Sequence, residues 1–450
     1  MSAPTQALIQ AYRCPPGLFN IELQSELGAD DGYFQFGPDI ICYGRSTTGF
    51  RKQQVGANLY DITRDVRADR AGILLPFNPT EIIENLRLER YSGNRESWIR
   101  SKGRKIYYYF RPFLHHSTRQ KIQKFQLRSW RTLPFPAWPV DSTVECIYEQ
   151  ILLLQLHATG ADRIPFIWFW PDRKESCAIM THDVEGKPGR DFCLELMDLD
   201  DSYGIKASFQ FVPEGSYSVS ADLLATIRAR GFEVAIQDLN HDGRLYDDRT
   251  EFLRRANLIN HYARDYGAKG FRGAVLYRKP EWYDAFAFSF DMSIPNTARL
   301  DPQRGGCCTV MPYFIGDILE LPVTTTQDYM LLYLLGERSI ELWKTQINLI
   351  MDKNGLTSFI VHPDYVRHDG LTKIYKDLLI YLRELQTSRN VWVTLPSDVD
   401  SWWRQRSKMQ LVQNGSEWLI QGEGAERAFV AYASNVDGNL VYDVRPALAP

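Results

Sequence analysis

A regular alternation of strand-like and helix-like segments governs what this chain can fold into. An apolar run over 177–183 precedes a helical pattern over 189–203, and the same pairing recurs at 206–213 with 220–230 and at 232–238 with 248–266. Further strands are predicted at 268–273, 286–292, 317–323, 356–362 and 391–394. Strands that alternate with helices pair in parallel and carry the helices outside. The sequence therefore predicts an α/β fold built on a barrel or an open sheet.

The regions on either side of this alternation have a different character. Residues 1–140 mix short strand-like stretches with a helix near 80–91, which indicates an N-terminal α+β accessory region. The barrel is expected over 160–405. Residues 408–450 contain three short strand-like stretches separated by turns, one of them Asn435-Val-Asp-Gly438, and predict a small C-terminal β module.

Composition excludes several classes of protein. The chain is 44% hydrophobic and 24% charged, as in ordinary globular proteins, and its net charge of −3 gives no general attraction to nucleic acid. Its seven cysteines are odd in number and have no CxxC spacing, which suits a reducing compartment. Because neither a signal peptide nor an apolar run long enough to span a bilayer is visible, we expect a cytoplasmic protein.

One stretch, 95–131, is rich in both basic and aromatic residues. It is open to two interpretations. It can be a peripheral contact with an anionic membrane or another polyanion, or a helix that packs its aromatic side on the next domain and exposes its basic side to solvent. We favour the second interpretation.

Polar side chains gather where the predicted strands end. Asp183 and Glu185 close the first apolar strand, and charge at the end of a buried strand is costly unless it is paired or bound to a metal. The later strand ends carry Gln237, Asn240, His241, Arg272, Asp291, Glu320 and His362. Singly, each has a structural explanation, such as a helix cap for Asp183 or a buried ion pair for Arg272. Together, at the carboxyl ends of parallel strands, they indicate an active site.

These residues resemble the motifs of the polysaccharide deacetylase family, of the NodB-homology or carbohydrate esterase 4 type. Thr181-His-Asp-Val-Glu185 looks like the family's first acidic motif, and the segment from Gly231 to His241 looks like its HxxxH motif with the preceding strand. The remaining matches are Phe271-Arg272-Gly273, Phe290-Asp291 and Phe359-Ile-Val-His362. The resemblance covers about 175–400 and implies a distorted (β/α)7 barrel.

The resemblance also implies a chemistry and a role for each residue. A divalent metal ion, Zn²⁺ or alternatively Co²⁺ or Mn²⁺, would polarise an acetyl carbonyl and activate water. Asp183 would be the general base and Arg272 would hold it in place, while His362 would protonate the leaving group and Asp291 would tune that histidine. The metal ligands would be Glu185, His241 and Gln237.

Two positions depart from the family pattern. Gln237 stands where the first histidine of HxxxH is expected, and an amide oxygen is a poorer ligand for zinc than an imidazole. Glu185 replaces the usual aspartate. His182, next to Asp183, could supply the missing imidazole, but neighbours along a strand point to opposite faces, so we expect it to be structural.

These observations leave three hypotheses. The first is a metal-dependent hydrolase that removes acetyl groups from an N- or O-acetylated carbohydrate. The second is a catalytically degenerate barrel, with weak or absent metal binding, that serves as a carbohydrate-binding or assembly protein. The third is a hydrolase of non-sugar amides.

Overall fold

The computed structural model describes residues 3–48, 54–56, 58–92, 125, 127 and 130–444. The chain divides into two compact units. One unit consists of residues 1–91, 141–174 and 401–450, and the other of residues 92–140 and 175–400. Most of the basic and aromatic stretch at 95–131, and with it the proposed surface contact, lies outside the described residues.

The first unit differs from the predicted division into separate end regions at 1–140 and 408–450. β18 (Val430–Val436) pairs antiparallel with both β19 (Asn439–Val444) and β6 (Ile164–Ile167), so the C-terminal tail completes a sheet begun near residue 164. The hydroxyls of Tyr12 and Tyr442 lie 2.6 Å apart. The tail is therefore part of the same unit as the N-terminal region. The apolar faces of the tail strands are covered by segments that are distant in sequence.

The other elements of the first unit are three helices and several short strands. Its helices are α1 (Gln6–Tyr12), α2 (Pro79–Arg87) and α5 (Thr143–Thr159). Its remaining strands are β1 (Ile21–Leu23), β2 (Gly32–Gln35), β3 (Ile41–Gly44), β4 (Arg67–Asp69), β5 (Gly72–Leu75), β16 (Gln410–Asn414) and β17 (Glu417–Gln421). Asn78 begins α2 as its cap, because its side chain accepts hydrogen bonds from the amides of Thr80 and Glu81.

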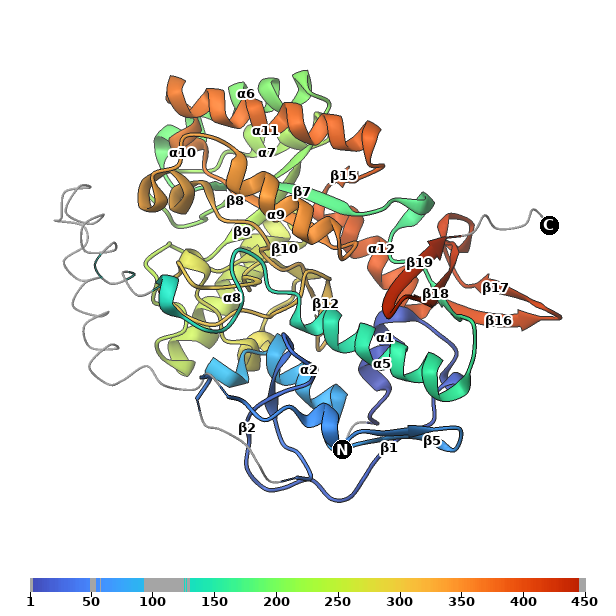
Figure 1. Cartoon of the computed structure of the whole chain (residues 1–450). Coiled ribbons are helices and arrows are strands. Elements are labelled where there is room, and N and C mark those ends of the chain that lie inside the picture. Colours follow the sequence, from blue (N-terminus) through green and yellow to red (C-terminus); the bar gives the residue numbers. More distant parts are fainter. Residues whose placement is uncertain are drawn as a thin grey trace. The chain divides into compact units, whose positions relative to one another are not determined.

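The second unit is built on a parallel sheet, shown in Figure 1. Its parallel strands are β14 (Leu356–Val361), β7 (Cys177–Val184), β8 (Ala207–Phe211), β9 (Glu233–Gln237), β10 (Gly270–Arg272), β11 (Phe290–Asp291) and β13 (Ile318–Glu320), in that spatial order. β12 (Tyr313–Ile315) pairs antiparallel with β13, and β15 (Trp392–Thr394) pairs with the start of β7.

Helices cover the outside of these strands. They are α6 (Lys187–Ser202), α7 (Ala221–Ala229), α8 (Arg249–Tyr266), α9 (Glu341–Met351), α10 (Pro363–Val366) and α11 (Asp369–Ser388), and α12 (Pro396–Lys408) follows β15. The apolar stripe of α11, which includes Leu378, Leu379 and Leu382, is buried in the same core as Trp343 and Ile347 of α9. This burial explains the strong helical periodicity of both segments in the sequence.

Threonine side chains close the sheet between β13 and β14, where the described strands form no regular ladder. The Thr324 hydroxyl donates to the Leu356 carbonyl and accepts from the Ser358 amide, each at 2.8 Å. The Thr325 hydroxyl donates to the Ser358 carbonyl at 2.7 Å. Seven parallel strands of the described residues, joined at one seam mainly by side chains, form the distorted (β/α)7 barrel that the sequence predicted.

Two findings bear on the environment of the chain. No helix within the described ranges is long and apolar enough to cross a membrane. All seven cysteines lie in those ranges as free thiols, and six of them are buried.

We predict that Thr324→Val weakens the seam. Valine keeps the shape of threonine but leaves the buried Ser358 amide without its acceptor, which costs about 1–3 kcal/mol. Chemical denaturation followed by circular dichroism would measure the free energy of unfolding. Thr345→Val, on an exposed position of α9, is the matched control and should change it little. Equal stabilities for the two variants would contradict the closure described above.

Candidate active site

The end of β7 supplies the two central carboxylates. Asp183 and Glu185 are two residues apart and so share one face of the chain, whereas His182 points to the other face. There its Nε2 lies 3.0 Å from Asp200 Oδ2 of α6 and its Nδ1 lies 3.1 Å from the Val361 carbonyl oxygen. His182 is fully buried in these contacts, so it supports the fold, as strand alternation predicted, and supplies no imidazole to the site.

Asp183 is buried and paired. Arg272 Nη1 donates to Asp183 Oδ1 at 2.5 Å and to the Thr181 hydroxyl at 2.8 Å, and Arg272 Nε donates to the Met292 carbonyl at 3.0 Å. Gln237 Nε2 donates to the other oxygen of Asp183, Oδ2, at 3.1 Å. The contact expected between Arg272 and Asp183 is therefore present. Gln237 also contacts the carboxylate expected to act as the base.

Glu185 lies between two imidazoles. Its Oε1 is 2.9 Å from His241 Nε2 and 3.5 Å from His362 Nε2, and 27% of its side chain is exposed. Burial alone would raise the pKa of Glu185, but the two imidazoles outweigh it and hold that pKa well below the usual range. Strand ends almost two hundred residues apart thus meet at one carboxylate.

His362 has a second carboxylate partner that the sequence did not reveal. Its Nδ1 lies 2.6 Å from Asp328 Oδ1, and its backbone amide donates to Asp328 Oδ2 at 2.7 Å. Burial lowers the pKa of His362, whereas Asp328 and then Glu185 raise it, and the net result is a pKa well above the usual value. Asp328 follows a strand end by eight residues and belongs to no motif, so the sequence offered no signal for it.

Asp291 does not tune His362, which corrects the expectation from sequence. Its Oδ2 accepts from the Tyr283 hydroxyl at 2.9 Å and its Oδ1 from the Ser293 hydroxyl at 2.7 Å. It is paired in register with Glu320 of β13, and burial raises the pKa of both carboxyls, with Asp291 raising that of Glu320 further. Two buried carboxyls this close share a proton more readily than they both ionise. Because both are buried and paired in register, we assign this pair to the barrel interior.

Asp364 is a positioning residue that the sequence analysis also missed. Its Oδ2 accepts from the amides of Glu185 and Gly186 at 3.2 and 3.3 Å, and its Oδ1 from the amide of Gly189 at 3.1 Å. These bonds fix the turn that carries Glu185 into the site. An added Cβ at Gly189 would lie 2.1 Å from Asp364 Oδ2, so the turn needs glycine there. Its place two residues after His362 was the available signal.

The residues present fit a divalent metal ion only weakly. Glu185 and His241 are suitable ligands and already in contact, but the third position is the neutral Gln237, whose buried Oε1 has no hydrogen-bond partner among the described residues. In the part of the chain that the structure describes, no group of three or more His, Cys, Asp or Glu residues could hold a metal ion. If an ion binds here, the amide oxygen of Gln237 would be its third ligand, and a weaker one than an imidazole.

The fold and the site together define a class: an α/β barrel with acidic and imidazole groups at the carboxyl ends of its parallel strands. Neither a family model nor a curated protein matches the sequence. In structure, the chain is similar to polysaccharide deacetylases. One is a putative polysaccharide deacetylase from Mycobacterium smegmatis, at 18% identity and a TM-score of 0.43, covering 56% of this chain and 98% of that one.

Two further solved structures are similar over about half of the chain. A probable polysaccharide deacetylase from Pseudomonas aeruginosa PAO1 has 12% identity and a TM-score of 0.40, covering 52% of this chain and 93% of the other. PuuE allantoinase has 11% identity and a TM-score of 0.41, covering 52% and 92%. At identities this low, the likeness concerns the fold.

We predict that Gln237→His strengthens metal binding. An imidazole in place of the amide would give zinc one carboxylate and two imidazole ligands, so Zn²⁺ affinity should rise by an order of magnitude or more. Isothermal titration calorimetry of metal-stripped protein would measure it. Gln413→His, at an exposed position of β16, controls for zinc bound by any added surface histidine. Equal affinities in the natural protein and Gln237→His would contradict this account.

Proposed function

We propose that the chain is a hydrolase that removes acetyl groups from an N- or O-acetylated carbohydrate. The observation that supports this most directly is the meeting of His241 and His362 at Glu185, two residues beyond the Arg272-bound Asp183. Acyl transfer to water requires an acid and a base near the reacting group.

Asp183 is the general base in this proposal. Arg272 holds its Oδ1 and Gln237 holds its Oδ2, so the carboxylate has one fixed orientation. A general base acts from a fixed position within hydrogen-bond reach of the water whose proton it takes. Arg272 contributes by positioning Asp183.

His362 is the general acid. The two carboxylates beside it favour the imidazolium form, with Nδ1 held by Asp328 and Nε2 on the side of Glu185. Nε2–H is then the proton that passes to the departing amine or alcohol when the acyl bond breaks. Asp328 fixes the ring as well as its charge.

Glu185, His241 and the Gln237 amide oxygen would hold a divalent ion, Zn²⁺ or alternatively Co²⁺ or Mn²⁺. When bound, such an ion polarises the acyl carbonyl and lowers the pKa of water. The imidazole of His241 must be neutral to act as a ligand.

We predict that Asp183→Asn reduces acetate release by about 10²–10⁴-fold, the usual contribution of a positioned general base. Acetate release from acetylated xylo- and chito-oligosaccharides would be measured with metal-supplemented protein. Asp222→Asn, at an exposed position in the first turn of α7, is the control and should keep full activity. Circular dichroism would verify that both variants are folded. Unreduced acetate release in Asp183→Asn would exclude this base.

We predict that Asp328→Asn shifts the pH dependence of the reaction. Asp328 raises the pKa of His362, and the acid must be protonated, so activity falls as pH rises through that pKa. With asparagine at 328 the pKa drops, and the alkaline limb of the kcat/KM profile moves to lower pH. An NMR titration of the His362 ring gives the same pKa without turnover. An unmoved limb together with a lowered ring pKa would assign the acid to another group.

The alternative of a non-catalytic carbohydrate-binding or assembly protein has one observation in its favour, the amide at Gln237. It requires that the natural protein release no acetate with any supplied metal, and that glycan affinity be the same in Asp183→Asn. Those two results together would replace the hydrolase proposal.

A further inference from the structure

His182 links the two strand ends that carry the proposed base and the proposed acid. It lies beside Asp183 on β7, and its Nδ1 is 3.1 Å from the carbonyl oxygen of Val361, the residue before His362. His182 and Val361 are also the last residues that pair in register along β7 and β14 in the described part of the chain. The imidazole therefore joins these two strands at the point where their backbone pairing ends.

Two helices that follow these strands fix the orientation of the His182 ring. Its Nε2 lies 3.0 Å from Asp200 Oδ2 of α6, and the Tyr375 hydroxyl of α11 donates to Asp200 Oδ1 at 2.7 Å. All three side chains are at most 1% exposed. A carbonyl oxygen can only accept a hydrogen bond, so Nδ1 carries a hydrogen, and Nε2 shares another with the Asp200 carboxylate. The network thus joins the β7–α6 and β14–α11 segments on the face of the sheet away from the site.

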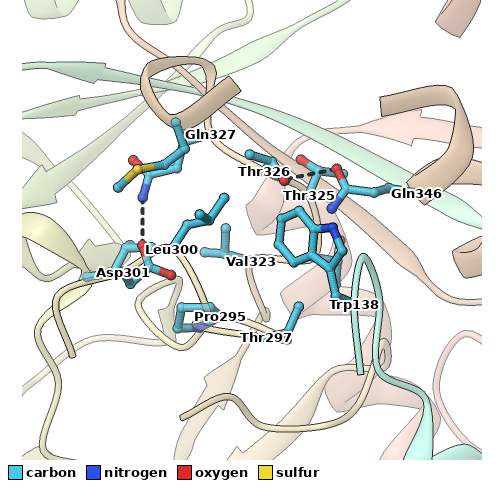
Figure 2. Close-up of a pocket in the computed structure, with 13 residues that line it drawn as sticks. Trp138, Pro295, Thr297, Leu300, Asp301, Val323, Thr325, Thr326, Gln327 and Gln346 are labelled. Carbon is cyan, nitrogen blue, oxygen red and sulfur yellow. Dashed lines mark hydrogen bonds between the residues drawn. The ribbon is translucent and has the colours of Figure 1, made fainter. Parts of the chain in front are cut away.

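A loop holds His362 from another direction. Asp328 Oδ2 accepts from the backbone amide of His362 at 2.7 Å, and Asp328 Oδ1 lies 2.6 Å from the ring atom Nδ1. Figure 2 shows that Gln327, the residue before Asp328, donates through Nε2 to Asp301 Oδ1, at 3.3 Å. His362 is therefore held by this loop and, through the preceding carbonyl, by His182.

We propose that His182 is a positioning residue, which keeps the proposed acid, His362, close to Glu185. The distance between His362 Nε2 and Glu185 Oε1 is 3.5 Å. Without the bond to the Val361 carbonyl, the end of β14 would stay with the loop that carries Asp328 and move away from Glu185. Small displacements of this kind slow a reaction strongly, because its groups must be held in a fixed geometry. The inference rests on the proposed function where it gives His362 a role in the reaction, but the link between the strands does not depend on hydrolysis.

Nuclear magnetic resonance of the full chain, labelled at its eight histidines, tests the link without hydrolysis. In the natural protein, His182 Nδ1 should give the signal of a protonated ring nitrogen. The test variant combines His182→Phe with Asp200→Asn, which removes the link and leaves no unpaired buried charge. Asp200→Asn alone is the matched control, because its amide can donate to Nε2 and still accept from Tyr375. At one fixed pH, the double variant should shift the His362 ring signal, and the control should leave it in place.

A second pair of variants changes the network less. Tyr375→Phe removes the hydroxyl that donates to Asp200, and it should shift the His362 signal in the same direction as the double variant but by less. Tyr283→Phe removes a similar hydroxyl, which donates to the buried Asp291, and it should leave that signal in place. Thermal melting would verify that each variant is folded. If the double variant does not fold, this pair decides the outcome.

Acetate release then measures the effect on the reaction. The kcat of the double variant should be about tenfold below that of Asp200→Asn, with KM within about twofold, because the change affects geometry rather than substrate contacts. An unprotonated Nδ1 of His182, an unmoved His362 signal, or equal kcat values in the double variant and its control would each overturn the assignment. If the natural protein released no acetate, the hydrolase proposal would fail, while the two signals would still decide whether His182 sets the position of His362.

Discussion

The buried ion pair between Asp183 and Arg272 is the interaction on which the site depends. Arg272 is fully buried, and it contacts Thr181 and Asp183 of β7 and the carbonyl of Met292 just beyond β11. The guanidinium of Arg272, which is part of β10, therefore links that strand to β7 and to the residue that follows β11. A buried charge is tolerated only when it is paired and hydrogen-bonded, so the pair fixes the orientation of the strand ends as well as that of the carboxylate. Glu185 is placed by the same strand two residues later.

Charge in the site is arranged as an alternating series. Asp328, His362, Glu185 and His241 follow one another in contact, so each imidazole has a carboxylate beside it and Glu185 has imidazoles on both sides. This order raises the pKa of His362 and lowers that of Glu185, which are the directions that the proposed acid and the proposed metal ligand need. Loss of Asp328 would therefore lower the pKa of His362, and loss of either imidazole would raise the pKa of Glu185.

The sequence predicted the barrel well because its strands are buried on both faces and end in polar residues. That pattern located Asp183, Glu185, His241, Arg272 and His362, and strand alternation correctly assigned His182 to the outer face. Asp328 and Asp364 were missed, since each lies in a helical turn beyond a strand end, and only Asp364, two residues after His362, had a signal in its position. The pairing of β18 with β6 was missed for a related reason. A strand's sequence shows that one face is apolar, but it does not identify the partner that covers that face.

The two ends of the Gln237 side-chain amide have different roles in the proposed site. Its amide nitrogen holds Asp183 Oδ2, and its carbonyl oxygen, on the same carbon, remains available as a weak ligand. Through this amide nitrogen, Asp183 has a second hydrogen-bond donor besides Arg272. In the proposed site, the glutamine therefore combines a weaker metal ligand with a second hydrogen bond to the base. On the proposed function, glutamine at 237 changes the metal ligand and leaves the carboxylate of Asp183 held in place.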